Sequence, residues 1–223
     1  MEYQTISATW PLLSLLQLVP LLAGLLLIRI RQRNAMILAL VASLLEIALA
    51  LTLYLNFDST QPTGVMQFAE QVPFWAAVQY HVAVDGMSVL FILLTTLLGF
   101  LCVVFILFRR LHGSSVLAVM MLVQATLVSQ LVTVDLLWFN LASILEMLLI
   151  AYLTKRWPAS DDVMPALVRF LQFMAVGLIL LFAGTLLLGW NYAALKGSWS
   201  FDLAKLATVN VPEEMEGVLF FLL

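Results

Sequence analysis

The sequence has 223 residues, of which 64% are hydrophobic and 10% charged, and its formal net charge at pH 7 is -3. Soluble domains normally have about a quarter of their residues charged, so this composition excludes a soluble protein and predicts an integral membrane protein. The ten basic residues form no extended basic face, which excludes nucleic acid as a partner, and the single cysteine excludes an intrachain disulfide.

The few residues that could bind a metal are scattered along the chain. Cys102 lies within an apolar run, and the two histidines, His81 and His112, fall in different loop regions. The sequence therefore predicts no metal, haem or iron–sulfur site, and both histidines are expected at the surface. The first nine residues lack a positive n-region, so the apolar run that follows is expected to stay as a first span instead of being cleaved as a signal peptide.

Six apolar stretches are long enough to cross about 30 Å of hydrocarbon, which takes roughly 20 helical residues. In chain order they cover residues 11–28, 35–57, 86–108, 116–134, 136–153 and 166–188. The fourth and fifth stretches are separated only by Asp135, which predicts a very tight turn or a shifted boundary. A seventh stretch starts at Gly217, and the chain ends at Leu223 within it. The predicted fold is an all-α, polytopic transmembrane helix bundle forming one domain over residues 1–223.

The basic residues predict the orientation in the membrane. If the spans alternate, nearly all of them fall on one side, and the opposite side has only Lys196 and Lys205. The positive-inside rule places the basic side in the cytoplasm and the N-terminus in the periplasm or lumen. The two long outer loops, about residues 58–85 and 189–216, hold many aromatics and are expected to lie along the membrane surface. The basic residues on the cytoplasmic side are Arg29, Arg31, Arg33, Arg109, Arg110, Lys155, Arg156 and Arg169.

Glu146 is the most informative residue of the chain. It lies about ten residues into the fifth stretch, and a carboxylate at that depth costs roughly 2.5–3.5 kcal/mol on insertion scales. Asn140, Ser143 and Glu146 follow one another at intervals of three residues, which predicts a polar stripe on this helix. An intramembrane acid on such a stripe predicts a functional role, typically in a proton path.

Other polar side chains within the spans have two interpretations. The fourth stretch has four of them on one helical face, where hydrogen bonds between helices are the commoner role and a proton path the other. Glu46, near the centre of the second stretch, is either a protonated packing residue or a pathway acid. Arg169 is either an anchor that reaches the interface or part of the path. The residues of the fourth-stretch face are Thr126, Ser129, Gln130 and Thr133.

A more specific signal begins at Tyr80. The segment Tyr80-His-Val-Ala-Val-Asp-Gly-Met-Ser88 resembles the start of the third helix in the antiporter-like membrane subunits of respiratory complex I, where a Val-Asp-Gly-(Ile/Leu)-Ser motif is characteristic. Asp85, Gly86 and Ser88 carry this motif, and Glu146 follows about sixty residues later, where the family has its fifth-helix glutamate. Residues 169–171 and 199–206 resemble the start of the sixth helix and the loop before the seventh. The M-type (NdhD-like) subunit is the best match, with Mrp-type antiporters and energy-converting hydrogenase subunits as alternatives.

The resemblance implies a role for Glu146 and for the whole chain. In the family this glutamate tunes the proton affinity of a lysine on the seventh helix, which this sequence does not contain, so the chain is expected to be truncated relative to the usual fourteen helices. The implied function is a membrane-arm subunit of a proton-pumping quinone oxidoreductase driven by NAD(P)H or ferredoxin. Its implied partners are the other membrane-arm subunits and the lipid bilayer, with quinone reached only through other subunits. No cofactor is expected in this subunit, nor any redox activity of the chain alone.

The sequence also departs from the family. Leu145 and Ala151 stand where the family commonly has an aromatic residue and a proline, which favours a specialised branch such as a photosynthetic NDH-type complex. The expected location is a bacterial inner membrane or a cyanobacterial or plastid thylakoid membrane. Two alternative functions stay open: a secondary Na⁺/H⁺ antiporter subunit of the Mrp kind, and a non-transporting structural or assembly subunit.

Overall fold

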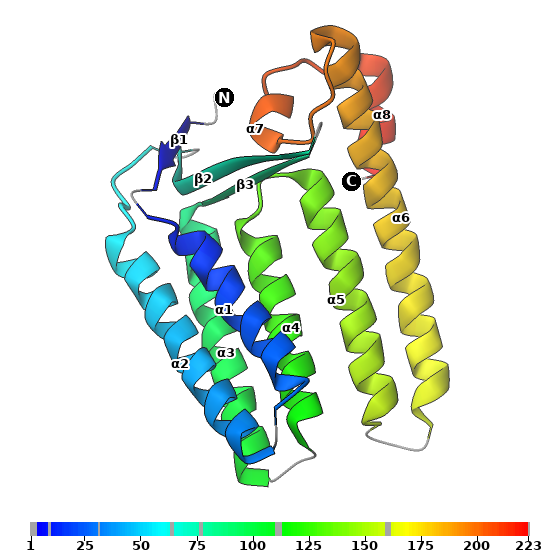
Figure 1. Cartoon of the computed structure of the whole chain (residues 1–223). Helices are drawn as coiled ribbons and strands as arrows, with labels where there is room; N and C mark the ends of the chain where they lie inside the picture. Colours follow the sequence, from blue (N-terminus) through cyan, green and yellow to red (C-terminus); the bar gives the residue numbers. More distant parts are fainter. Residues whose placement is uncertain are drawn as a thin grey trace.

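A computed structural model describes residues 4–8, 10–30, 32–62, 65–75, 78–109, 113–158 and 162–222. Of the residues named above, Arg31, Arg110, His112 and Leu223 lie outside the described part. Helices make up most of the fold and stand side by side (Figure 1). In chain order they are α1(Leu12–Leu27), α2(Gln32–Asn56), α3(Gly86–Arg109), α4(Gly113–Val132), α5(Leu136–Arg156), α6(Val163–Lys196), α7(Leu203–Leu206) and α8(Glu213–Leu222).

Five of these helices, α2 to α6, are long and apolar enough to cross a membrane, as expected for an integral membrane protein. The first predicted span corresponds to α1, which is apolar but has only 16 residues. The tight turn predicted at Asp135 is confirmed, because α4 ends at Val132 and α5 begins at Leu136. The helix α6 has 34 residues and continues past the predicted end at 188 to Gly197, whose left-handed backbone (φ 75°) ends it.

The first outer loop, expected from the sequence as a loop along the membrane surface, contains β-structure. A three-stranded sheet forms there from β1(Gln4–Ser7), β2(Val65–Trp75) and β3(Val78–Val84), with β1 parallel to β2 and β2 antiparallel to β3. The all-α prediction is therefore wrong for this part of the chain. The physical reason is that residues 78–84 are rich in β-branched and aromatic side chains, which favour a strand once partner strands are present. The sheet lies across one end of the bundle (Figure 1).

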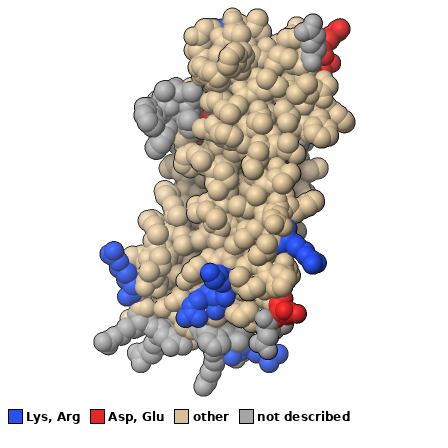
Figure 2. All heavy atoms as spheres, turned by 90° about the vertical axis from the view of Figure 1, so that its right-hand side faces the viewer, with Lys and Arg blue, Asp and Glu red and all other residues tan. Residues whose placement is uncertain are grey.

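The helices differ in how far they are enclosed. The helix α4 packs against α1, α3 and α5. In the apolar 18-residue segment of α4, 56% of the residues are buried, whereas the corresponding share is 11% in both α5 and α6. The core therefore lies among α1 to α4, and α5 and α6 pack at one side of it with most of their residues not buried. On the α6 side, the described residues of a broad belt show no charged side chain in this view, and Lys and Arg gather at the end away from the sheet (Figure 2). This belt is what hydrocarbon contact requires.

Candidate functional site

The site around Glu146 is positioned by the start of α5. The Asp135 carboxylate caps that helix by accepting hydrogen bonds from the backbone N–H groups of Leu137 at 2.9 Å and Trp138 at 3.0 Å. Glu146 follows Asp135 by eleven residues, which is about 16 Å along a helix of 1.5 Å rise per residue. Since α5 has 21 residues, Glu146 lies near the middle of its length.

Side chains of α4 and α5 meet at Glu146. The Gln130 Nε2 of α4 donates a short hydrogen bond to Glu146 Oε2. The Ser143 hydroxyl lies within hydrogen-bond distance of both Gln130 Oε1 (3.1 Å) and the Phe139 carbonyl (2.9 Å). The half-buried carboxylate is thus held by an amide whose own orientation is fixed by a hydroxyl. Such a pair of helices can support a carboxylate at mid-depth without an ion pair.

The predicted α5 stripe divides between two partners. Asn140 is buried and donates to the Leu136 carbonyl at 2.8 Å and to Thr185 Oγ1 of α6 at 2.9 Å, away from Glu146. The reason is geometric: six residues advance a helix by 600°, so Asn140 and Glu146 point about 120° apart. Ser143 lies between them and turns toward Gln130. Within the described residues, Asn140 Oδ1 is a buried oxygen with no hydrogen-bond partner.

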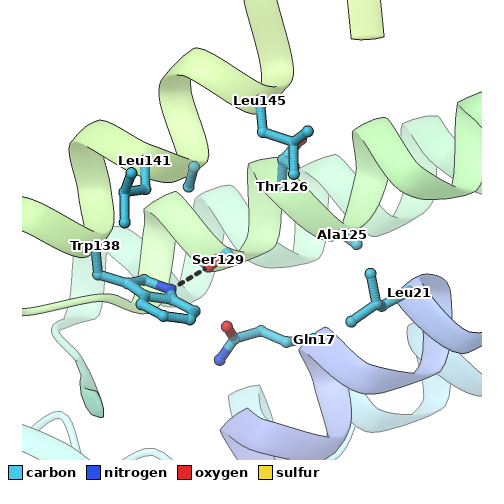
Figure 3. Close-up of a pocket in the computed structure, with 9 residues that line it drawn as sticks. Gln17, Leu21, Ala125, Thr126, Ser129, Trp138, Leu141 and Leu145 are labelled. Atoms are coloured by element: carbon cyan, nitrogen blue, oxygen red, sulfur yellow. Dashed lines mark hydrogen bonds between the residues drawn. The ribbon is translucent and has the colours of Figure 1, made fainter. Parts of the chain in front are cut away.

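The predicted α4 stripe divides in the same way. Thr126 and Ser129 line a cavity of about 260 Å³ between α1, α4 and α5, whereas Gln130 turns to Glu146 (Figure 3). The Trp138 indole N–H donates to Ser129 Oγ at 3.0 Å across one wall of this cavity. The hydroxyl of Thr133, directly after α4, forms hydrogen bonds with the backbone of Asp135. The structure therefore brings together Gln130, Ser143 and Glu146, and separates the remaining stripe residues from them.

Glu46 has a partner that the sequence reading missed. Its carboxylate, on α2, is 1% exposed and accepts a hydrogen bond of 3.0 Å from Gln124 Nε2 of α4. Gly99 of α3 makes room for this amide, because a Cβ there would lie 2.7 Å from Gln124 Oε1. In the sequence, this partner is indicated only by the spacing of Gln124 and Gln130. The two are six residues apart, so their side chains point to different sides of α4. Each intramembrane acid is thus held by one glutamine of α4.

The remaining predicted residues lie apart from both acids. Asp85 Oδ1 accepts from the Ser88 backbone N–H at 2.7 Å, so the motif at Asp85, Gly86 and Ser88 caps the start of α3. Arg169 is exposed on α6 and forms no hydrogen bond or ion pair with any residue that the structure describes. The described ranges also contain no group of three or more His, Cys, Asp or Glu that could hold a metal ion.

The expectation that His81 lies at the surface is wrong. Its side chain is buried on β3, and its Nδ1 lies 2.8 Å from Asp202 Oδ2, just before α7. Backbone hydrogen bonds join the same segments: the Val134 N–H donates to the His81 carbonyl at 2.9 Å, and the Leu203 N–H donates to the Val134 carbonyl at 3.0 Å. The turn between α4 and α5 is therefore clamped between β3 and the segment before α7.

Asp135→Asn tests how charge in this clamp affects stability. Burial raises the pKa of the Asp135 carboxyl, and the Asp202 charge adds to this, although backbone N–H groups of Trp138, Gln79 and Leu137 partly oppose it. A raised folded-state pKa means that the folded state binds the proton more tightly, so stability falls as pH rises from the unfolded to the folded pKa. Asparagine also caps helices well. We expect the variant to melt at the same or a higher temperature at pH 7 in detergent, and to lose this pH dependence.

A melting temperature that still falls over the same pH window in Asp135→Asn would contradict this assignment. Asp58→Asn is the matched control, because that carboxylate is fully exposed in the α2–β2 loop and its pKa is lowered, mainly by hydrogen bonds from Thr60. For a lowered pKa the sign is opposite, and stability falls as pH drops through the folded-state value.

Comparisons with known proteins give relatives for this arrangement, although no protein-family model matches the chain. It is 28% identical over 180 residues to NADH-quinone oxidoreductase subunit M of Rhodobacter capsulatus. This alignment covers 76% of this chain and 34% of the relative. It is 23% identical over 196 residues to subunit M of Rickettsia bellii, covering 86% and 38%. A chain of the respiratory complex I structure from Thermus thermophilus with bound NADH superimposes with a TM-score of 0.77 at 27% identity, covering 94% of this chain and 42% of that one.

The chain thus spans little more than a third of the length of these subunit M relatives. Sequence and fold agree with each other, since the structural match covers nearly the whole chain. The findings support the expectation drawn from the Val-Asp-Gly-Met-Ser segment, without separating the M type from other types. The protein is an integral membrane protein similar in sequence and fold to the antiporter-like membrane subunits of respiratory complex I.

Proposed function

We propose that this chain is part of an M-type membrane-arm subunit of a proton-translocating quinone oxidoreductase, driven by NAD(P)H or ferredoxin. The observation that carries the proposal is the hydrogen-bonded group of Gln130, Ser143 and Glu146 at the middle of α5, in a chain with this similarity. Glu146 is the proton-path carboxylate that tunes the proton affinity of a partner lysine, and Gln130 and Ser143 orient this carboxylate.

The energy for transport comes from outside this chain. Moving one proton against 100 mV costs about 2.3 kcal/mol, and the proposed redox reaction runs in other subunits of the complex. The partners are these subunits and the lipid bilayer, and quinone is contacted only by them. A lysine on a seventh helix, which the resemblance implies, would complete the pair with Glu146. Glu46 of α2 and Gln124 of α4 are a second acid and amide, on a side of α4 about 120° from Gln130, and are open to the same role.

The proposed orientation follows the charges. Arg109, Lys155 and Arg156 lie in the last turns of α3 and α5, and Arg169 lies in the second turn of α6. These helix ends are away from the sheet, which favours the cytoplasm or its equivalent on that side. The sheet and the N-terminus then face the periplasm or lumen. A bacterial inner membrane or a thylakoid membrane of a cyanobacterium or plastid fits this arrangement.

The direct test compares the parent and Glu146→Gln proteins in sealed membrane vesicles that hold the complete complex. The proposal expects fewer protons transported per electron in the variant, with the subunit still assembled. A non-transporting assembly subunit predicts the parent stoichiometry instead, so the same measurement decides between the two functions.

A second measurement separates proton pumping from secondary Na⁺/H⁺ exchange, the function that Mrp-like subunits would have. We expect substrate-driven proton transport to continue in vesicles prepared without sodium, because protonation of Glu146 needs no second ion. The control adds sodium to the same vesicles without redox substrate. Proton movement that requires sodium and proceeds without redox substrate would favour the antiporter and contradict the pump.

A further inference from the structure

A chain of hydrogen bonds leads from the sheet into the helix bundle at a place that the Glu146 site does not use. Glu70, half-buried on β2, accepts the Ser14 hydroxyl proton in a short hydrogen bond. Ser14 Oγ lies 2.9 Å from Tyr80 OH of β3, and Gln17 Nε2 donates to the same phenol at 2.8 Å. Four polar side chains from three elements are thus in continuous contact.

The donors and acceptors of this chain have a defined direction. The Ser14 hydroxyl has one hydrogen, and its bond to the Glu70 carboxylate uses it, so Tyr80 must be the donor in the bond between the two hydroxyls. Gln17 donates to Tyr80, so the phenol oxygen acts there as an acceptor. The order is therefore Tyr80 O–H to Ser14 O–H to the Glu70 carboxylate, directed from the bundle toward the sheet.

Gln17, the innermost member of the chain, lines the cavity of about 260 Å³ between α1, α4 and α5, and Tyr80 lies one hydrogen bond behind it. Gln17 lines this cavity together with Thr126 and Ser129, and its amide points toward the Trp138 ring (Figure 3). The cavity wall is mostly apolar, so water is confined to its polar edge, where Gln17, Thr126 and Ser129 offer hydrogen-bond partners to a water molecule.

We propose that Tyr80, Ser14 and Glu70 form a proton relay between this cavity and the sheet-bearing side of the membrane, an inference that rests on the proposed transport function. A water molecule in the cavity gives a proton to the Tyr80 oxygen as Tyr80 passes its own proton to Ser14, and Ser14 passes its own to Glu70. Each oxygen gains one O–H bond and loses one, so a single proton moves and both hydroxyls are regenerated. Glu70 then releases the proton to the outer side.

The surroundings of Tyr80 fit a relay that works with neutral hydroxyls. Burial raises the pKa of the Tyr80 phenol, and the Glu70 charge raises it further, although hydrogen bonds with Ser14 and Gln17 partly oppose this. The phenol therefore keeps its proton at neutral pH and can only exchange it. Edge-to-face contact with Trp138, at 6.0 Å between ring centroids, fixes the ring that carries the hydroxyl.

A purely structural role for Glu70 is the competing explanation. Its Oε1 accepts from the Leu13 backbone N–H at 2.7 Å and its Oε2 from the Ser14 N–H at 3.2 Å, so the carboxylate also caps the start of α1. A cap needs only an acceptor oxygen, which glutamine retains, and it needs no phenolic hydroxyl. Tyr80→Phe and Glu70→Gln therefore remove the relay and leave the ring packing and an acceptor for the cap in place.

The test measures the initial rate of substrate-driven proton transport in vesicles that contain the complete complex. Because proton transfer by a positioned group contributes about 10²–10⁴-fold, we expect Tyr80→Phe to slow transport by about tenfold or more. Tyr152→Phe is the matched control, since Tyr152 makes the same edge-to-face contact with a tryptophan, Trp157 at 6.2 Å, and we expect the parent rate. A parent rate in assembled Tyr80→Phe would overturn the relay.

Two further variants make each outcome decisive. If Tyr80→Phe fails to assemble, Glu70→Gln decides, with slow transport supporting the relay and a parent rate overturning it. Glu146→Gln is measured in parallel. Slow transport in Glu146→Gln with a parent rate in Tyr80→Phe refutes the relay alone, whereas parent rates in both also refute the proposed function.

Discussion

Glu146→Gln is expected to lower the number of protons transported per electron. The initial rate of proton transport should fall by about tenfold or more, as for other positioned proton-transfer groups. Glutamine has nearly the same shape, and its Oε1 can still accept the hydrogen bond from Gln130 Nε2. It cannot take the charged form that tunes the proposed partner lysine, so transport slows while helix packing persists. The measurement combines a pH-sensitive dye in sealed vesicles with the electron-transfer rate of the same vesicles.

The control for this prediction is Glu216→Gln, the same chemical change at an exposed position of α8. We expect it to leave stoichiometry and rate unchanged. Amounts of assembled subunit in the membrane should be equal in both variants and the parent. If Glu146→Gln transports the parent number of protons per electron, the carboxyl is not on the path, and its role is limited to holding α4 and α5 together.

Much of the helical framework could be predicted because the bilayer constrains it strongly. A span needs a long apolar run, and the runs found at residues 35–57, 86–108 and 136–153 correspond closely to α2, α3 and α5. The turn at Asp135 was predictable for the same reason, since one charged residue interrupts two apolar runs. Outside the membrane this constraint disappears, and the strands β2 and β3 depend on pairing between residues that hydropathy does not relate.

The candidate site was only partly predictable, because helical spacing gives angles on one helix and not the identity of the neighbour. Spacing correctly indicated that Gln130 and Ser143 lie on polar faces, and the structure shows that these two meet at Glu146. It could not show that Asn140 faces α6 instead. It also could not show that Gln124 reaches Glu46, a contact between side chains 78 residues apart. Such long-range partners follow from packing alone.

The largest effect on stability is expected at the clamp around His81. Removing the imidazole leaves a buried carboxylate oxygen without its hydrogen-bond partner, which typically costs about 1–3 kcal/mol and more for a charged group. The Asp202 carboxylate is 1% exposed in the parent protein, and its neighbour across the Asp135–Asp202 bridge is a second buried acid. We therefore expect a large drop in the unfolding free energy, measured by denaturant titration in detergent micelles.

A double-mutant cycle distinguishes loss of the pair from loss of packing around the imidazole. Asp202→Asn keeps an oxygen for the Ala204 backbone N–H, which Asp202 Oδ1 accepts at 2.9 Å, and it removes the charge that His81 faces. In the double variant His81→Ala/Asp202→Asn no unpaired carboxylate remains at this position, so its loss of stability should be smaller than the sum of the single losses. Simple additivity would mean that the two side chains do not stabilise each other. The clamp would then depend on the backbone hydrogen bonds that join His81, Val134 and Leu203, and the imidazole would serve only to fill space beneath the sheet.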